Sequence, residues 1–247
     1  MTLAKHGLST RVIVNGFDTS GIFNSADINA EAEMFNVTVF NSAGLEYIPG
    51  QPDAKVVLEG FLPCSDPVAL NNLVDTEFRT KLGALPANNQ LILIGPEGYS
   101  SQSDLILIAS GDAVNYKTNT QVKGIAQINL GFQASNGLLI AVPLAPVQTV
   151  AAGASQNGAA VDNGAATTKG LIAQFHVLNF AAAGTLDLKV QHSPDGAVWT
   201  DLVTLPQKNA RGAFRLEVAG TVNRYTRVVR SSTGGPVTFA VAIHRKS

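Results

Sequence analysis

The chain has 247 residues, of which 45% are hydrophobic and only 14% are charged, and its formal net charge is −1. This length can bury a full core as one large β domain or as two smaller ones. A surface so poor in charge is unusual for a soluble monomer and favours a protein that covers itself with copies of a partner. The single cysteine, Cys64, excludes an internal disulfide, and the four scattered histidines show no metal-ligand spacing.

The two halves of the chain differ in charge. Residues 1–145 contain 7 Lys and Arg against 13 Asp and Glu, whereas residues 146–247 contain 10 against 5. The sequence therefore has an acidic half and a basic half. No apolar run is long enough for a membrane helix, and the N-terminus lacks the apolar region of a secretory signal. We expect a protein that is made in the cytoplasm and is not inserted into a membrane.

In the acidic half, a short strand from Arg11 stops at Asn15-Gly16, and a longer alternating segment runs from Ser25 to Phe40. Small and apolar residues occupy one face of this segment, and Asp27, Asn29, Glu31 and Glu33 occupy the other. The alternation predicts one long strand, or two strands joined by a bulge near Met34. The next stretch, Asn41–Asp53, is rich in Gly and Pro and predicts a loop, with Leu45, Tyr47 and Ile48 as apolar anchors.

A strand at Lys55–Phe61 is followed by the only helix that the sequence predicts. Asp66 supplies an N-cap, and Pro67 is a proline at the first helical position. Apolar residues then recur every three or four residues, and Gly83 ends the helix, so we expect it at residues 67–82. Five further strands follow before residue 145. In the segment Gln121–Gln133, Ile128 and Leu130 are expected to point inward, while Gln127 and Asn129 point to water.

The basic half begins with a stretch of small and polar residues, 146–169, which we interpret as a linker and entry loops. Six short strands with regular turn signals then predict a β-sandwich of immunoglobulin-like size at residues 170–247. The expected fold is mainly β. An N-terminal β-sandwich or barrel domain at residues 1–145, with its one helix, is joined to this C-terminal sandwich.

One motif in the basic half, at residues 193–199, has two interpretations. Ser193-Pro194-Asp195-Gly196, followed by Trp199, resembles the Asp-box of sialidase-like propellers with one residue missing. Such boxes recur once per blade, and this chain has one. We therefore interpret Asp195-Gly196 as a hairpin turn and Trp199 as a core residue. The carboxylate pair Glu31/Glu33 falls on a solvated face, which does not favour acid–base catalysis, so we predict no enzyme activity, no metal and no cofactor.

The order of features resembles the tail tube proteins of long-tailed bacteriophages over residues 8–145. The resemblance rests on the segment Val12–Gly21, the strand with the acidic face, Tyr47-Ile48-Pro49-Gly50, the strand ending Leu58-Glu59-Gly60, and the helix after it. The C-terminal part looks like the β-sandwich domain that some phage tail proteins append. This second resemblance rests on Val190–Gly196, Trp199 and Arg224-Tyr225-Thr226-Arg227-Val228.

This resemblance implies a virion protein whose subunits form hexameric rings that stack into a hollow tube, with other tail proteins as partners. A sheet from each subunit would line a channel through which DNA passes without sequence-specific binding, and an acidic or polar lumen would repel phosphates. The lumen-facing candidates are Asp27, Glu31, Glu33, Glu59, Gln127 and Asn129, although Lys55 and Lys123 share their parity. Leu45, Tyr47 and Ile48 are the candidates for contact between subunits.

The resemblance further implies that the C-terminal domain decorates the outside of the virion, where it could touch the host surface, and that deleting residues 150–247 leaves tube formation intact. Two other classes remain open. One is a carbohydrate-binding or sialidase-like surface protein, which requires exposed aromatic side chains on a sandwich face. The other is a different phage tail component or a capsid decoration protein.

Overall fold

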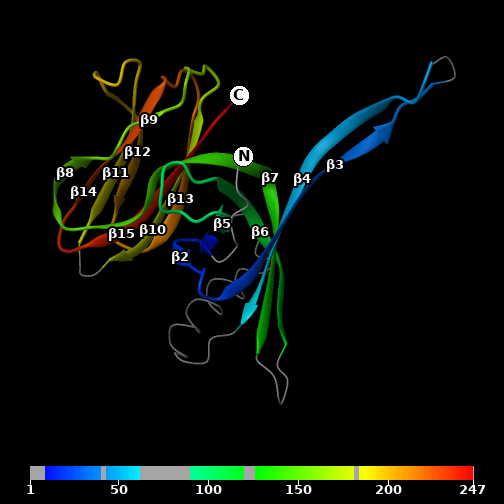
Figure 1. Ribbon diagram of the computed structural model, residues 1–247, viewed down its shortest axis with the longest axis horizontal. Coiled ribbons are helices and arrows are strands. Elements are labelled where there is room, and N and C mark those ends of the chain that lie inside the picture. The colour runs from blue at the N-terminus through cyan, green and yellow to red at the C-terminus, as the bar shows by residue number, and fades with distance from the viewer. Residues whose placement is uncertain (1–8, 40–42, 62–89, 120–125, 181–183, 247) are drawn as a thin grey trace. The chain divides into compact units, whose positions relative to one another are not determined.

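The computed structural model describes residues 9–39, 43–61, 90–119, 126–180 and 184–246 and is mainly β, as predicted (Figure 1). The helix expected at residues 67–82 lies outside the described residues. Fifteen strands are described: β1 (Arg11–Val14), β2 (Phe17–Asp18), β3 (Phe23–Asn36), β4 (Tyr47–Phe61), β5 (Gln90–Gly95), β6 (Ile106–Asn119), β7 (Gln127–Val150), β8 (Gly153–Asn157), β9 (Val161–Asp162), β10 (Leu171–Phe180), β11 (Leu186–Ser193), β12 (Thr200–Lys208), β13 (Gly212–Val218), β14 (Tyr225–Ser232) and β15 (Val237–Arg245).

The chain forms two compact units. Unit 1 contains Met1–Gly21, Leu91–Ile108 and Leu139–Ser247, and unit 2 contains Ile22–Gln90 and Ala109–Leu138. Strands β6 and β7 each pass from one unit to the other. Residues 146–169, expected as a linker and loops, contain the end of β7 together with β8 and β9.

Two sheets of unit 1 pack against each other through alternating apolar side chains. One sheet has the order β13-β10-β15 followed by the second half of β7, and the other has the order β12-β11-β14, with β8 and β9 both paired to β14. Every second residue of β10 and β11 points into the core between them. The buried residues contributed by these two strands are Leu171, Ala173, Phe175, Val177, Leu186, Leu188 and Val190.

Strand β10 is covered on its opposite face as well, because the first eight of its residues are all buried. Ile172 and Leu178 on that face join a second core with Ile13 of β1, Leu93 of β5 and Tyr99. The Tyr99 hydroxyl donates a hydrogen bond to the carbonyl oxygen of Val241 at 2.7 Å. Segments from the N-terminal half of the sequence thus share a core with β10 and β15.

A tight turn places β1 and β2 on this layer. Asn15 and Gly16 have φ angles of 51° and 80°, the left-handed pair that a two-residue hairpin turn requires. A Cβ atom on Gly16 would lie only 2.6 Å from the carbonyl oxygen of Val177. Glycine is therefore required here both by the turn and by the close approach of β10.

The Ser193–Gly196 segment lies in the hairpin connection between the antiparallel strands β11 and β12, as predicted. The Asp195 carboxylate accepts hydrogen bonds from the backbone amides of Val198 and Ala197 and from the Ser193 hydroxyl, and these bonds lower the pKa of Asp195. The prediction that Trp199 fills the core is wrong. Its side chain is only partly buried, and its indole nitrogen donates to the carbonyl oxygen of Gly196 at 3.1 Å. The smaller residues of β10, β11, β14 and β15 fill the core instead.

Unit 2 contains a four-stranded antiparallel sheet with the order β6-β7-β4-β3. Strand β4 pairs with β7 only from Lys55 to Phe61, but it pairs with β3 along nearly its whole length. Figure 1 shows β3 and β4 continuing as a two-stranded ribbon past the part where β4 lies beside β7. We call this ribbon, residues 31–39 and 43–53, the arm.

The arm corrects one sequence prediction and confirms another. Residues 41–53 were expected as a loop, but β4 begins at Tyr47. Two prolines argued against a strand there, yet this part of β4 has β3 as its only described partner, which is where prolines are tolerated. The bulge expected near Met34 is confirmed by a register shift between Ala32 and Met34.

Candidate functional site

The register of unit 2 gathers the candidate polar residues on one face of its sheet. Directly paired residues in a sheet point to the same face. Ser25 pairs with Glu59, Glu59 pairs with Asn129, and Phe61 pairs with Gln127. Asp27 and Glu31 follow Ser25 on the same face of β3 by the two-residue alternation. The structure therefore brings Asp27, Glu31, Glu59, Gln127 and Asn129 together, on what we call the polar face.

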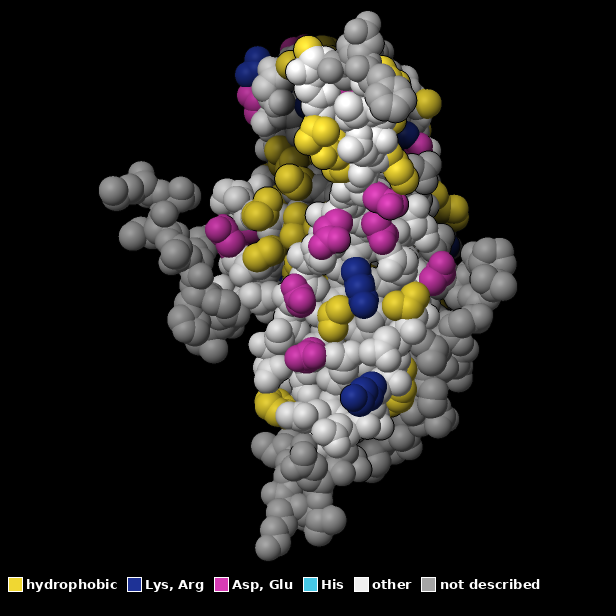
Figure 2. Space-filling model, turned by 90° about the vertical axis from the view of Figure 1, so that its right-hand side faces the viewer, with side chains coloured by type: hydrophobic (Ala, Val, Ile, Leu, Met, Phe, Trp, Pro, Cys, Tyr) yellow, Lys and Arg dark blue, Asp and Glu magenta, His cyan; other side chains and the backbone are white. Residues whose placement is uncertain are grey.

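Glu33 shares this face, because the bulge adds its extra residue to β4 and not to β3. Between the flanking pairs the register advances two residues on β3, from Ala32 to Met34, but three on β4, from Pro52 to Pro49. The alternation of β3 therefore continues through Glu33. In Figure 2, the side of the molecule formed by β3, β4 and β7 faces the viewer and carries several Asp and Glu side chains with a few Lys or Arg between them.

The opposite face of the sheet explains why the polar face has a fixed orientation. Val56, Leu58, Ile128, Leu130 and Phe132 alternate with the polar residues and are at most 2% exposed. A slip of one residue in the register would place all of these side chains in water. Their burial, worth about 1.5–3 kcal/mol for each large side chain, therefore also fixes which carboxylates face solvent.

Side-chain amides donate hydrogen bonds to carboxylates of the polar face, both across strands and within β3. Asn115 donates to the Asn129 carbonyl oxygen at 2.7 Å, and Asn129 in turn donates to Glu59 at 2.6 Å. Asn29 donates to Glu31 at 2.6 Å, and Gln133 donates to Asp53. Amide donors compensate the carboxylates without neutralising their charge, so the face keeps its acidic character while its side chains are held in place.

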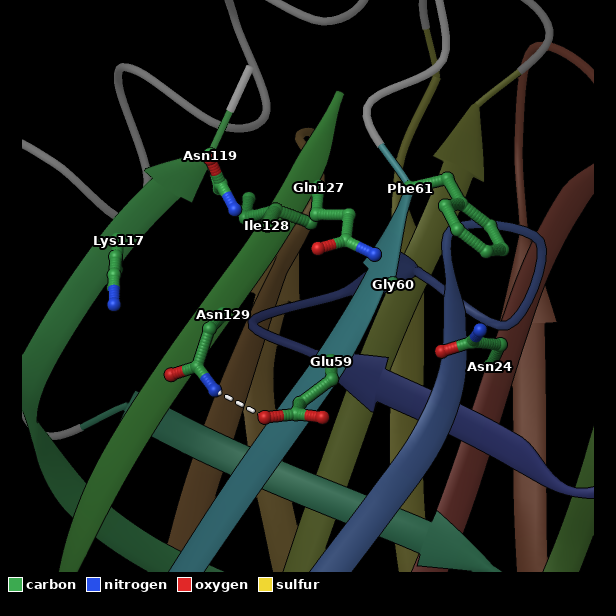
Figure 3. A pocket seen from close by; sticks show the side chains of 9 residues that line it. All are labelled: Asn24, Glu59, Gly60, Phe61, Lys117, Asn119, Gln127, Ile128 and Asn129. Atoms are coloured by element: carbon green, nitrogen blue, oxygen red, sulfur yellow. Dashed lines mark hydrogen bonds between the residues drawn. The ribbon is translucent and has the colours of Figure 1, made fainter. Parts of the chain in front are cut away.

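The polar face contains a pocket of about 250 Å³ around Glu59 and Asn129. Figure 3 shows Asn129 and Glu59 joined by their hydrogen bond, with Lys117, Asn119 and Gln127 on neighbouring strands. Amides and charged groups of both signs line it, beside Phe61, which is 40% exposed. Within the described ranges there is no cluster of three or more His, Cys, Asp or Glu residues that could hold a metal ion. The chemistry of this lining suits contact with water and polar surfaces.

The face is acidic but not uniformly so. Lys55, opposite Asn29, and Lys117, which lines the pocket beside Glu59, both belong to it. Five carboxylates occupy the face together with these two lysines: Asp27, Glu31, Glu33, Asp53 and Glu59. Lys55 was expected as an exception, and Lys123, the other expected exception, lies outside the described residues. Lys117 and the amides of Asn115 and Gln133 were not predicted as partners of the acidic residues.

The arm carries large apolar side chains in water. The expected anchors Leu45, Tyr47 and Ile48 are 72%, 49% and 55% exposed. Four further exposed apolar residues were not predicted as contact residues, and they belong to the predicted strand or to its end: Met34 at 54%, Phe35 at 50%, Val37 at 38% and Val39 at 64%. The alternation of a strand does not tell whether a further layer covers its apolar side chains, so the exposure of these residues could not be predicted from the sequence.

Beyond Glu33, both faces of the arm carry large apolar side chains. Phe35 pairs with Ile48, so these two side chains share one face, and Asn36 pairs with Tyr47 on the other. Met34 lies on the face of Asn36 and Tyr47, since it precedes Asn36 by two residues. An isolated two-stranded ribbon is only marginally stable in water, and exposed apolar patches of this kind mark interaction surfaces.

The described part of the chain contains no helix long and apolar enough to cross a membrane. No family model matches the sequence, and no curated protein matches it. Similar solved structures include a chain in the virion of a native gene transfer agent particle. It is 14% identical, with 56% of this chain and 98% of that chain covered, at a TM-score of 0.40.

Two further similar structures come from SPP1. Its Dit (gp 19.1) protein, described as a hub of the adsorption apparatus in phages that infect Gram-positive hosts, is 12% identical over 96% of this chain and 99% of that chain, at a TM-score of 0.37. The SPP1 tail tube is 9% identical over 56% and 78%, at a TM-score of 0.41. These neighbours are virion, hub and tail tube structures. Likeness at these identities and TM-scores carries no inference about function, which we draw from the chain's own surfaces.

Proposed function

We propose that the chain is a structural protein of a bacteriophage tail that assembles with copies of itself into stacked hexameric rings, forming the tail tube. Its role is assembly without catalysis, and other tail proteins are its further partners. The observation that carries this proposal is the arm, a two-stranded ribbon with large exposed apolar side chains on both faces. Such a ribbon is stabilised when another chain covers it.

The free edge of β3 supports self-association. Among the described strands, β3 pairs only with β4, and its 14 residues contain no proline, lysine or arginine. Long edges without these protective residues are templates for pairing with a strand of another chain. Pairing along this edge would extend the sheet of one subunit into the sheet of the next, in a head-to-tail contact that closes into a ring.

The polar face is then the lining of the channel. Asp27, Glu31, Glu33 and Glu59, with Gln127 and Asn129, present carboxylates and amides to the water in the lumen. Carboxylates repel the phosphates of passing DNA and the amides offer no stacking surface, so the duplex moves without being held. Lys55 and Lys117 temper the repulsion at two levels of the face.

The arm supplies the contact between subunits, through Leu45, Tyr47 and Ile48 together with Met34 and Phe35. The double-layered part of unit 1 would be an immunoglobulin-like sandwich on the outside of the virion. Its surplus of basic residues suits contact with an acidic cell surface.

The test is an Ile48→Glu substitution in the purified full chain, followed by sedimentation velocity and negative-stain electron microscopy. The unsubstituted protein should form rings or tubes, because burying the arm removes its apolar side chains from water. Ile48→Glu places a charge in that contact and should leave monomers, with assembly reduced at least about tenfold, the effect of roughly 1.4 kcal/mol.

The matched control is Ile140→Glu, since Ile140 is also an isoleucine on a strand and is 67% exposed, but lies in unit 1 away from the arm in sequence. This variant should assemble like the unsubstituted chain. A chain that stays monomeric at every concentration, or an Ile48→Glu variant that assembles normally, would contradict the proposal.

A further inference from the structure

The outer face of the β12-β11-β14 sheet in unit 1 holds the only tryptophan of the chain. Trp199 is partly exposed there, and the guanidinium of Arg227 stacks over its ring, 4.1 Å from the ring centroid. Its neighbour Val198 is 67% exposed. Because Trp199 does not fill the core, its aromatic ring lies at the surface of the sheet, beside a cation.

Hydrogen bonds across three strands hold this arginine in position. Gln191 pairs with Asp201 of β12 on one side and with Arg227 of β14 on the other. Arg227 donates through Nε and Nη2 to the Gln191 carbonyl oxygen at 2.9 and 2.8 Å. Gln191 in turn donates to Asp201 at 2.7 Å, and Lys189 donates to the other oxygen of Asp201 at 2.8 Å. The planar end of Arg227 is thus preorganised between a ring and an amide.

The charge of Arg227 is not neutralised by a carboxylate within the described parts of the chain. Lys189 pairs with Asp201 and Arg224 pairs with Asp162, whereas the hydrogen-bond acceptor of Arg227 is a neutral amide. Its Nη1 nitrogen makes no hydrogen bond to described residues, so it can still donate. Residues 146–247 carry 10 Lys and Arg against 5 Asp and Glu, which favours an anionic ligand here.

We propose that this face binds an anionic saccharide. The carboxylate or phosphate of the sugar pairs with Arg227, and the sugar ring lies against the exposed part of Trp199. Guanidinium groups match such oxyanions through paired N–H donors, and the indole offers an apolar surface to the C–H face of a pyranose. Asp201 and the amide of Gln191 are within the same network and suit sugar hydroxyls.

The site is a shallow platform, so we expect a weak dissociation constant, on the order of millimolar for one copy. Weak sites become effective when many copies are displayed together, because linked sites act at high effective concentration. The binding itself does not depend on assembly of the chain. It can therefore be tested apart from the proposed tail tube function.

The test uses Trp199 as the reporter, since its emission is the only tryptophan signal of the full chain. The probes are trigalacturonate, which carries carboxylates, glucose 6-phosphate, which carries a phosphate, and the neutral maltotriose. We expect a saturable change in emission with at least one acidic saccharide, at least tenfold tighter than with maltotriose. A trimeric single-stranded oligonucleotide should bind more weakly than the acidic saccharide.

Two variants separate a specific site from general charge attraction. Arg227→Gln should weaken binding of the acidic saccharide at least tenfold. Arg211→Gln should leave it unchanged, because Arg211 also stacks on an aromatic ring, that of Phe17, away from this network. Circular dichroism of both variants checks folding, and Arg227→Lys, which keeps the charge but loses the fork, should bind with intermediate affinity.

The proposal is overturned if neither acidic saccharide changes the emission, or if maltotriose or the oligonucleotide binds as tightly. It is also overturned if both glutamine variants weaken binding equally. Loss of binding in Arg227→Gln with a native spectrum, and with Arg211→Gln unaffected, supports it.

Discussion

His176 and Gln174 are fully buried polar side chains on β10, on the face that the N-terminal strands cover. The Gln174 amide nitrogen lies 3.2 Å from the carbonyl oxygen of Ile92 and 2.9 Å from His176 Nε2. Among the residues that the structure describes, the side-chain carbonyl oxygen of Gln174 and His176 Nδ1 have no hydrogen-bond partner. Burial lowers the pKa of His176 to about 3, because a charged imidazole would lose its hydration there.

This burial predicts that the chain loses stability in mild acid. The unfolded chain takes up a proton at His176 below its ordinary pKa of about 6.5, whereas the folded chain does so only near 3, so the free energy of unfolding falls as the pH falls through that window. Between pH 7 and pH 5 the loss from this residue is roughly 2 kcal/mol. Urea unfolding at the two pH values measures it.

The control variant is His176→Gln, which keeps a polar side chain but cannot titrate. Its free energy of unfolding should change less between pH 7 and pH 5 than that of the unsubstituted chain. The pKa of His192 is also lowered by burial, so part of the pH dependence should remain in the variant. An identical pH dependence in both proteins would show that His176 is not the group responsible.

The sequence could not predict these environments, and the reason is physical. In the segment Leu171–Leu178, Gln174 and His176 occupy the alternate positions that would face water in a two-layered sandwich. They are buried because a layer from β1 and β5, about eighty or more residues earlier, covers them. Trp199 shows the reverse case, since a large aromatic residue was expected inside and instead lies under an arginine at the surface.

At the scale of elements, β3 and β4 come close together at the end of their pairing opposite the arm, where Phe23 pairs with Gly60, and glycine is needed at that point. A Cβ atom on Gly60 would lie 2.1 Å from the carbonyl oxygen of Ile22, which accepts a hydrogen bond from the Phe61 amide at 3.0 Å. Gly60→Ala should therefore separate the two strands and destabilise the chain by about 1–3 kcal/mol in urea unfolding.

The matched variant is Gly44→Ala, because nothing lies within 4 Å of a Cβ atom at that position near the tip of the arm. Its free energy of unfolding should stay within roughly 0.5 kcal/mol of the original. If both variants were equally stable, the close approach of β3 and β4 at Gly60 would not be a feature of the folded chain in solution.

The elements that the sequence predicted correctly are those whose alternation is fixed by one buried face. Gln127 and Asn129 are predicted on one side of their strand because Ile128 and Leu130 require the other, and both of these apolar side chains are buried. The start of β4 was missed because Pro49 and Pro52 act as breakers in most strands, and their tolerance depends on β4 having a single partner there. The expected role of these residues in a lumen stays a prediction.

At the scale of the whole molecule, the shared core of unit 1 makes a prediction about truncation. From the sequence we expect a separate N-terminal domain that still forms tubes after deletion of residues 150–247. In the structure, Ile13, Leu93 and Tyr99 pack against side chains of β10 and β15, and the Tyr99 hydroxyl bonds to Val241. A chain ending at residue 150 would leave this apolar surface in water. Each Å² of it would cost about 25 cal/mol of folding free energy. We therefore expect the fragment to lack a cooperative thermal transition and to be digested by trypsin at least tenfold faster than the full chain. A fragment that melts cooperatively and resists trypsin would show instead that residues 1–150 fold independently, as the sequence suggested.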